Sequence, residues 1–180
     1  ASGVCLAYLN NLGQLVVSLG GKEDGQVVFV SLFSVANAAG RLVMGYVHEH
    51  FLHNRGTPRT LFLTMPAAVT AAVILAAAYA HVTHLYVVSL LLGLAFGAHW
   101  SLLPAITSEL FGLKHFAPNY TTLKFAPAAG SYLLSTRLTG WLYDTAAARH
   151  GDPHECIGSD CFREAFLLLS ALAAISSVAC

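Results

Sequence analysis

The sequence has few charged side chains. Of its 180 residues, nine are Lys or Arg and nine are Asp or Glu, so 10% are charged, whereas 56% are hydrophobic. Soluble domains carry about 25% charged residues, because a surface that faces water needs them. A chain this poor in charge favours lipid as its solvent. The formal net charge is zero, which leaves no electrostatic basis for binding nucleic acid.

Recognisable enzyme motifs are also lacking. The sequence holds no glycine-rich phosphate loop and no nucleophile elbow, and no acidic residue lies deep in an apolar stretch. Three of the nine histidines, at positions 48, 50 and 53, surround Glu49, but their spacing is not the His-Glu-x-x-His of a zinc site. We therefore expect no enzyme activity, no cofactor and no metal.

Six apolar stretches follow one another, separated by polar segments. A transmembrane helix needs about 20 mainly apolar residues to cross a hydrocarbon core about 30 Å thick. Short links make neighbouring helices antiparallel, so the pattern predicts an all-α polytopic membrane helix bundle, with residues 1–180 as a single membrane domain. The predicted helices cover about residues 4–20, 26–47, 60–80, 85–103, 120–143 and 165–180.

The chain begins just before one apolar stretch and stops inside another, so we expect it to be a fragment of a longer polypeptide. It would then be an integral, multi-pass protein of the plasma membrane or of an endomembrane. Basic residues favour cytoplasmic loops. The count narrowly favours a cytoplasmic location for the loops that hold Arg55, Arg59 and Lys114.

Polar residues inside the predicted spans are the strongest indication of function, since a polar group in lipid costs free energy unless it meets a partner or a wet cavity. Asn10, Asn11, Gln14 and Ser18 lie on one face of the first helix. This face either lines a solute path or holds helices together by hydrogen bonds. Asn37 lies in a similar polar stripe of the second helix.

The fourth and fifth predicted helices differ in character. The fourth has a small residue at every fourth position, which predicts a groove for close packing, or a sliding surface, and it also holds His99. The fifth contains Pro127 and Gly130, which predict a bent or locally opened helix. Its Arg137 either extends to the membrane surface or meets a solute. Our candidates for a substrate cavity are Asn11, Gln14, Asn37, His99 and Arg137.

Two cysteines, Cys156 and Cys161, share the last polar loop. They form either a small disulfide on a non-cytosolic face or two free thiols. Together with the neighbouring His150 and His154 they also resemble a zinc ligand set, but spacing and setting favour the disulfide.

Several motifs in the right order resemble the nodulin-like branch of the major facilitator superfamily. Gly40, Arg41 and Gly45, followed by Arg55 and Arg59, resemble the cytoplasmic loop motif between helices eight and nine of that superfamily. The wider likeness rests on residues 11–14, 18–20, 109–116, 130–133 and 140–144 and on Cys156 and Cys161.

This resemblance implies that the chain is the C-terminal half of a twelve-helix major facilitator fold. It further implies a secondary transporter that moves a small polar or anionic solute by alternating access. The expected partners are the lipid bilayer, the missing N-terminal half of the same protein and a small-molecule solute. The alternative is a transporter-like membrane sensor or scaffold without flux.

Overall fold

The computed structural model describes residues 1–55, 61–149, 158 and 160–179, and every regular element in these ranges is helical. This confirms the predicted all-α membrane bundle. The elements are α1 (Ser2–Asn10), α2 (Leu12–Ser18), η1 (Glu23–Gly25), α3 (Gln26–Arg55), α4 (Leu61–Ala77), η2 (Val82–His84), α5 (Leu85–Leu123), α6 (Phe125–Ser131), η3 (Tyr132–Thr139), α7 (Gly140–Arg149) and α8 (Asp160–Val178). Of these, η1 and η2 are 3-10 helices and η3 is a π-helix.

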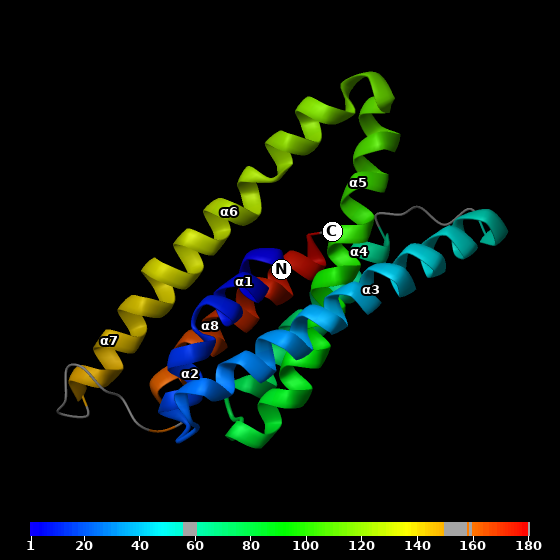
Figure 1. The fold of residues 1–180 in the computed structure, drawn as a ribbon. Helices are drawn as coiled ribbons and strands as arrows, with labels where there is room; N and C mark the ends of the chain where they lie inside the picture. Colours follow the sequence, from blue (N-terminus) through cyan, green and yellow to red (C-terminus); the bar gives the residue numbers. More distant parts are fainter. Residues whose placement is uncertain (56–60, 150–157, 159, 180) are drawn as a thin grey trace.

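Several elements join into longer rods, as Figure 1 shows. The helices α1 and α2 follow each other across Asn11, and α6, η3 and α7 continue the second part of α5. The chain reverses within α5 at Gly112, the one α5 residue with non-helical backbone angles (φ 68°, ψ 165°). From that point it runs back alongside the bundle to α7.

The helix boundaries differ from the prediction in several places. We expected a polar loop over residues 144–164, yet α7 continues to Arg149 and α8 begins at Asp160. We expected one helix to end near residue 103 and a loop to cover residues 108–118, yet α5 continues through Pro104 and is helical on both sides of Gly112. We also expected a loop from His48 onward, whereas α3 continues to Arg55. There His48 Nδ1 lies 2.8 Å from the Met44 carbonyl oxygen, a contact that a helical turn provides.

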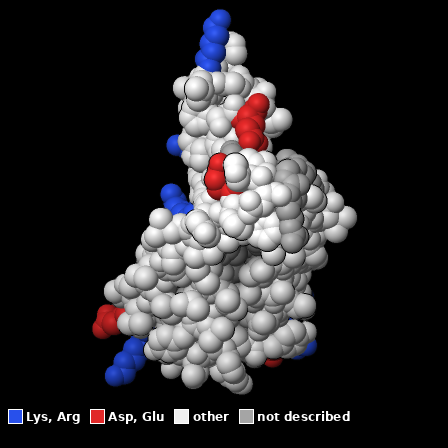
Figure 2. All heavy atoms as spheres, turned by 90° about the vertical axis from the view of Figure 1, so that its right-hand side faces the viewer, with Lys and Arg blue, Asp and Glu red and all other residues white. Residues whose placement is uncertain are grey.

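Three described helical stretches are long and apolar enough to cross a membrane: Gln26–Asn54, Val82–Arg149 with its reversal, and Asp160–Val178. The apolar α4 is shorter, at 17 residues. In Figure 2 the charged side chains on the visible face lie over its upper half and near its lower end, with an uncharged band between these two regions. This distribution suits helices that span a bilayer, where charge is tolerated near the interfaces.

Glycines bring α3 and α5 into close contact. An added Cβ on Gly93 would lie 2.5 Å from the Phe33 carbonyl oxygen, and one on Gly40 would collide with the backbone of Leu94. A Cβ on Gly97 would likewise collide with the Asn37 carbonyl oxygen. Of the small residues predicted to form a packing groove on the fourth helix, Gly93 and Gly97 therefore do so, and they allow the two backbones to approach as small residues do in membrane helix pairs.

The first helix is buried in the centre of the bundle and is held there by two side-chain contacts. The Tyr8 hydroxyl lies 2.7 Å from Ser89 Oγ on α5, and Cys5 Sγ lies 3.7 Å from Thr70 Oγ1 on α4. All four side chains are buried. In a core without water, such pairs satisfy polar groups that would otherwise destabilise the fold.

We predict that Tyr8→Phe lowers the free energy of unfolding of the intact protein by about 1 kcal/mol, because it leaves the buried Ser89 hydroxyl without its partner. The exposed Tyr132 makes no hydrogen bond with the residues that the structure describes, so Tyr132→Phe is the matched control. Thermal unfolding of the purified protein in detergent measures both. Equal melting temperatures for the two variants would contradict the assigned role of the Tyr8–Ser89 pair.

Candidate functional site

A polar pocket of about 550 Å³ lies where the first helical rod meets the π-helix and the start of α3. Its lining is dominated by amide and hydroxyl side chains. An added Cβ on Gly13 would lie 2.5 Å from Oε1 of Gln26, so the absence of a side chain on Gly13 gives Gln26 its place beside α2. The lining residues are Leu9, Asn10, Asn11, Gly13, Gln14, Gln26, Ser135, Thr136 and Gly140.

Two asparagines of the pocket connect the rod formed by α1 and α2 to the facing rod, which is formed by α6, η3 and α7. Asn10 Nδ2 donates to Ser131 Oγ at 3.0 Å, and Asn11 Nδ2 donates to Ser135 Oγ at 2.9 Å. Asn11 Nδ2 also lies 2.8 Å from the carbonyl oxygen of Ala7. The same polar face thus lines a pocket and holds two helices together, so the two interpretations left open by the sequence do not exclude each other.

Gln14 differs from these asparagines. Its side chain is exposed at the pocket and makes no hydrogen bond to any residue that the structure describes. Its amide therefore retains both its donors and its acceptor for a ligand. Gln14 shares this property with Gln26 and Thr136, which also line the pocket, are exposed and make no hydrogen bond with the described residues.

The π-helix forms the opposite wall of the pocket. Thr139 Oγ1 donates to the carbonyl oxygen of Leu134, five residues earlier, at 2.7 Å. Just before it, Gly130 packs against Gly3 of α1, where an added Cβ on Gly3 would lie 3.2 Å from the Gly130 backbone. The sequence predicted a locally opened helix from Pro127 and Gly130, and π-helical turns of this kind are frequent at functional sites.

Three of the predicted cavity residues do not line this pocket. Asn37 Oδ1 accepts from Arg41 Nε at 3.2 Å, and His99 is buried with Nδ1 3.1 Å from the Ala95 carbonyl oxygen. Arg137 is exposed and makes no hydrogen bond or ion pair with the described residues. Only Asn11 and Gln14 of the predicted set come together here, and contact of any of the five with a solute stays a prediction.

Sequence reasoning missed Gln26, Ser135 and Thr136 as cavity candidates. Gln26 is the first residue of α3, and a polar residue at the start of a span is expected at the membrane interface. Ser135 and Thr136 reach the pocket through the π-helix, whose extra residue per turn changes which side chains share a face.

The predicted cytoplasmic loop motif is helical where the structure describes it. Gly40, Arg41 and Gly45 all lie inside α3, and Gly40 contacts α5. Arg55 is the last residue of α3, and Arg59 lies outside the described residues. The motif therefore begins in the helix and not in the loop that follows it.

The predicted disulfide involves one residue outside the described ranges, Cys156. Cys161 is disulfide-bonded, while its pairing with Cys156 stays a prediction. Nearby, the Gly158 amide donates to the carbonyl oxygen of Ser18 at 2.8 Å. This hydrogen bond connects Gly158, which precedes α8, with the end of α2. Within the described ranges, no group of three or more His, Cys, Asp or Glu side chains is placed to hold a metal ion.

A polar pocket within a bundle of apolar helices is an arrangement by which transporters bind their solutes. Fold and site together define a transporter-like integral membrane protein. The family model described as "NFD4, C-terminal domain" matches residues 1–179, and the chain belongs to this family. This confirms the resemblance to the nodulin-like branch of the major facilitator superfamily and the assignment to its C-terminal half.

Curated relatives agree with this assignment at low identity. The chain is 30% identical to Protein NUCLEAR FUSION DEFECTIVE 4 of Arabidopsis thaliana, over 96% of the chain and 31% of that protein. It is 27% identical to Probable transporter MCH1 of Gibberella zeae, over 69% of the chain and 27% of that protein. It is 29% identical to Monocarboxylate transporter 9 of Rattus norvegicus, over 68% of the chain and 23% of that protein.

The chain thus spans less than a third of the length of each of these relatives. Two of the three are named as transporters and none as an enzyme. No solved structure matches the chain.

Proposed function

We propose that the intact protein is a secondary transporter that moves a small polar or anionic solute across the membrane by alternating access. The observation that carries this proposal is the 550 Å³ polar pocket, with the exposed amide of Gln14 in its wall. The names of two relatives, a probable transporter and a monocarboxylate transporter, support it. The solute path would be completed by an N-terminal half, the part of the relatives that this chain does not cover.

The contacts around the pocket suit a path that opens and closes. The rod formed by α1 and α2 is joined to the rod that faces it by the Asn10–Ser131 and Asn11–Ser135 hydrogen bonds, and each such bond contributes only about 0.5 to 1.5 kcal/mol net. The π-helix beside them is a kind of helical turn that is frequent at functional sites. Rocking of one helix group against another, the motion by which such transporters work, would use both features.

Uptake into proteoliposomes that contain the full-length protein tests this function. The panel would hold labelled monocarboxylates and small neutral polar solutes, each with and without a proton or sodium gradient. Transport of one class that depends on the protein supports the proposal. A specific solute that binds without any flux would favour the alternative, a transporter-like sensor or scaffold.

For a transported solute, we predict that Gln14→Leu reduces kcat/KM about tenfold, because the loss of one or two hydrogen bonds to the solute costs roughly 1.4 kcal/mol. Val17→Leu is the control, since Val17 is exposed on the same helix and does not line the pocket. Initial uptake rates over a range of solute concentrations give the ratio. An unchanged kcat/KM for Gln14→Leu would place the solute elsewhere.

A further inference from the structure

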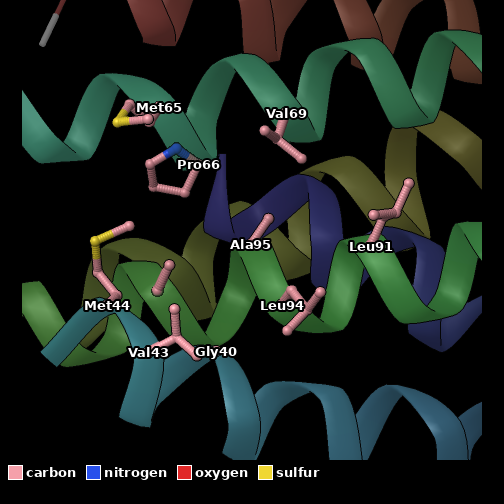
Figure 3. Close-up of a pocket in the computed structure, with 10 residues that line it drawn as sticks. Gly40, Val43, Met44, Met65, Pro66, Val69, Leu91, Leu94 and Ala95 are labelled. Atoms are coloured by element: carbon pink, nitrogen blue, oxygen red, sulfur yellow. The ribbon is translucent and has the colours of Figure 1, made fainter. Parts of the chain in front are cut away.

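A second hollow, of about 310 Å³, lies between α3, α4 and α5 and is entirely different in character from the polar pocket. Figure 3 shows side chains from all three helices around it, with α5 between the other two and with Met44 and Met65 at the same end. The two hollows share no lining residue. We call this hollow the apolar groove, and its lining residues are Gly40, Val43, Met44, Met65, Pro66, Val69, Leu91, Leu94, Ala95 and Ala98.

Small residues create the apolar groove. Gly40 is packed against the backbone of Leu94, so it places no side chain between α3 and α5. Ala95 and Ala98 of α5 contribute only methyl groups. The flexible thioether chains of Met44 and Met65 line one end, and such side chains adapt to an occupant of variable shape.

The groove does not suit water. A buried water needs two to four polar partners, and every side chain that lines this hollow is apolar. The volume would hold roughly ten groups the size of a water molecule, at about 30 Å³ each. An occupant must therefore be apolar and longer than a single small group.

The rim of the groove opens onto the surface of membrane-spanning helices. Val43 and Met65 are each 60% exposed, and Val69 is 41% exposed. The α5 residues of the groove, from Leu91 to Ala98, lie roughly 9 to 20 Å along the helix from its start at Leu85, which is within a hydrocarbon core about 30 Å thick. At that depth, the apolar molecules around the protein are lipid chains.

We propose that the apolar groove is a binding site for one acyl chain of a membrane phospholipid. The acyl chain occupies the space bounded by α3, α4 and α5. At the end toward the α3–α4 connection, the Phe51 and Phe62 rings pack with centroids 5.8 Å apart and join the two helices. The chain enters from the bilayer at the exposed rim. It is held by the groove walls on three sides, whereas a lipid on a flat helix surface has contact on one side only.

Native mass spectrometry of the intact protein tests this site by counting the phospholipids that stay bound after extraction into detergent. Val69→Trp fills the rim of the groove, and Ala98→Leu fills its floor. Leu75→Trp is the matched control, because Leu75 is a 46% exposed residue of the same helix that does not line the groove. Circular dichroism and size-exclusion chromatography identify variants that are folded.

The expected result is that Val69→Trp or Ala98→Leu, whichever is folded, retains one phospholipid fewer than wild type, while Leu75→Trp retains the wild-type number. The same number in all folded proteins overturns the proposal. If neither groove variant folds, p-benzoylphenylalanine at position 69 of the otherwise wild-type protein, activated in its native membrane, gives the answer. A cross-link to phospholipid supports the site, and a cross-link to another part of the polypeptide or to a second copy overturns it.

Discussion

Gly97→Leu is expected to lower the free energy of unfolding by about 3 kcal/mol and to remove most of the folded protein from the membrane. Gly97 is fully enclosed by α3, where an added Cβ would collide with the Asn37 carbonyl oxygen and would lie 2.9 Å from the Arg41 amide nitrogen. Both neighbours are backbone atoms. Because a backbone cannot rotate away as a side chain can, α3 and α5 would have to move apart where they pack against each other.

Gly45→Leu is the matched control, because Gly45 lies on α3, the helix against which Gly97 packs, with nothing within 4 Å of an added Cβ. We expect it to be neutral or slightly stabilising, since leucine favours a helix more than glycine does. Expression yield and thermal unfolding of the full-length protein compare the two variants. A Gly97→Leu protein as stable as Gly45→Leu would show that α3 and α5 do not pack as closely as the structure has them.

The contact between α3 and α5 illustrates what the sequence predicts well. Small residues four positions apart mark a face that two membrane helices can share, and Gly93 and Gly97 occupy that face. Helix ends were harder to predict. Pro104 predicted a kink or an end of the helix because proline lacks an amide donor, but neighbouring helices stabilise proline inside membrane spans, and α5 continues through it.

The pocket shows a different limit. Spacing alone placed Asn11 and Gln14 on one face, because both belong to a single nearly regular rod. Their partners across the pocket depend on a π-helix, which changes the register of the side chains after Gly130. Regular α-helical spacing therefore could not show that Ser135 would face the pocket or that Arg137 would be exposed.

The reversal at Gly112 provides the second prediction. Gly112→Ala is expected to lower the free energy of unfolding by about 2 kcal/mol, because backbone angles of φ 68° and ψ 165° lie in a region that is essentially restricted to glycine. For a domain of this size, that corresponds to a drop of roughly 4 to 8 °C in melting temperature. The effect should concentrate at the turn, where Lys114 is exposed two residues away.

Limited trypsin digestion after Lys114 therefore measures the local effect and thermal unfolding measures the global one. Gly140→Ala is the control, because Gly140 has helical angles (φ −61°, ψ −49°) and open space around an added Cβ, so alanine there is expected to be neutral or to stabilise by up to about 1 kcal/mol. Equal cleavage at Lys114 in both variants would contradict the assigned turn. Since an added Cβ on Gly112 also meets nothing within 4 Å, any loss there comes from backbone strain and not from crowding, which is what distinguishes this glycine from Gly97.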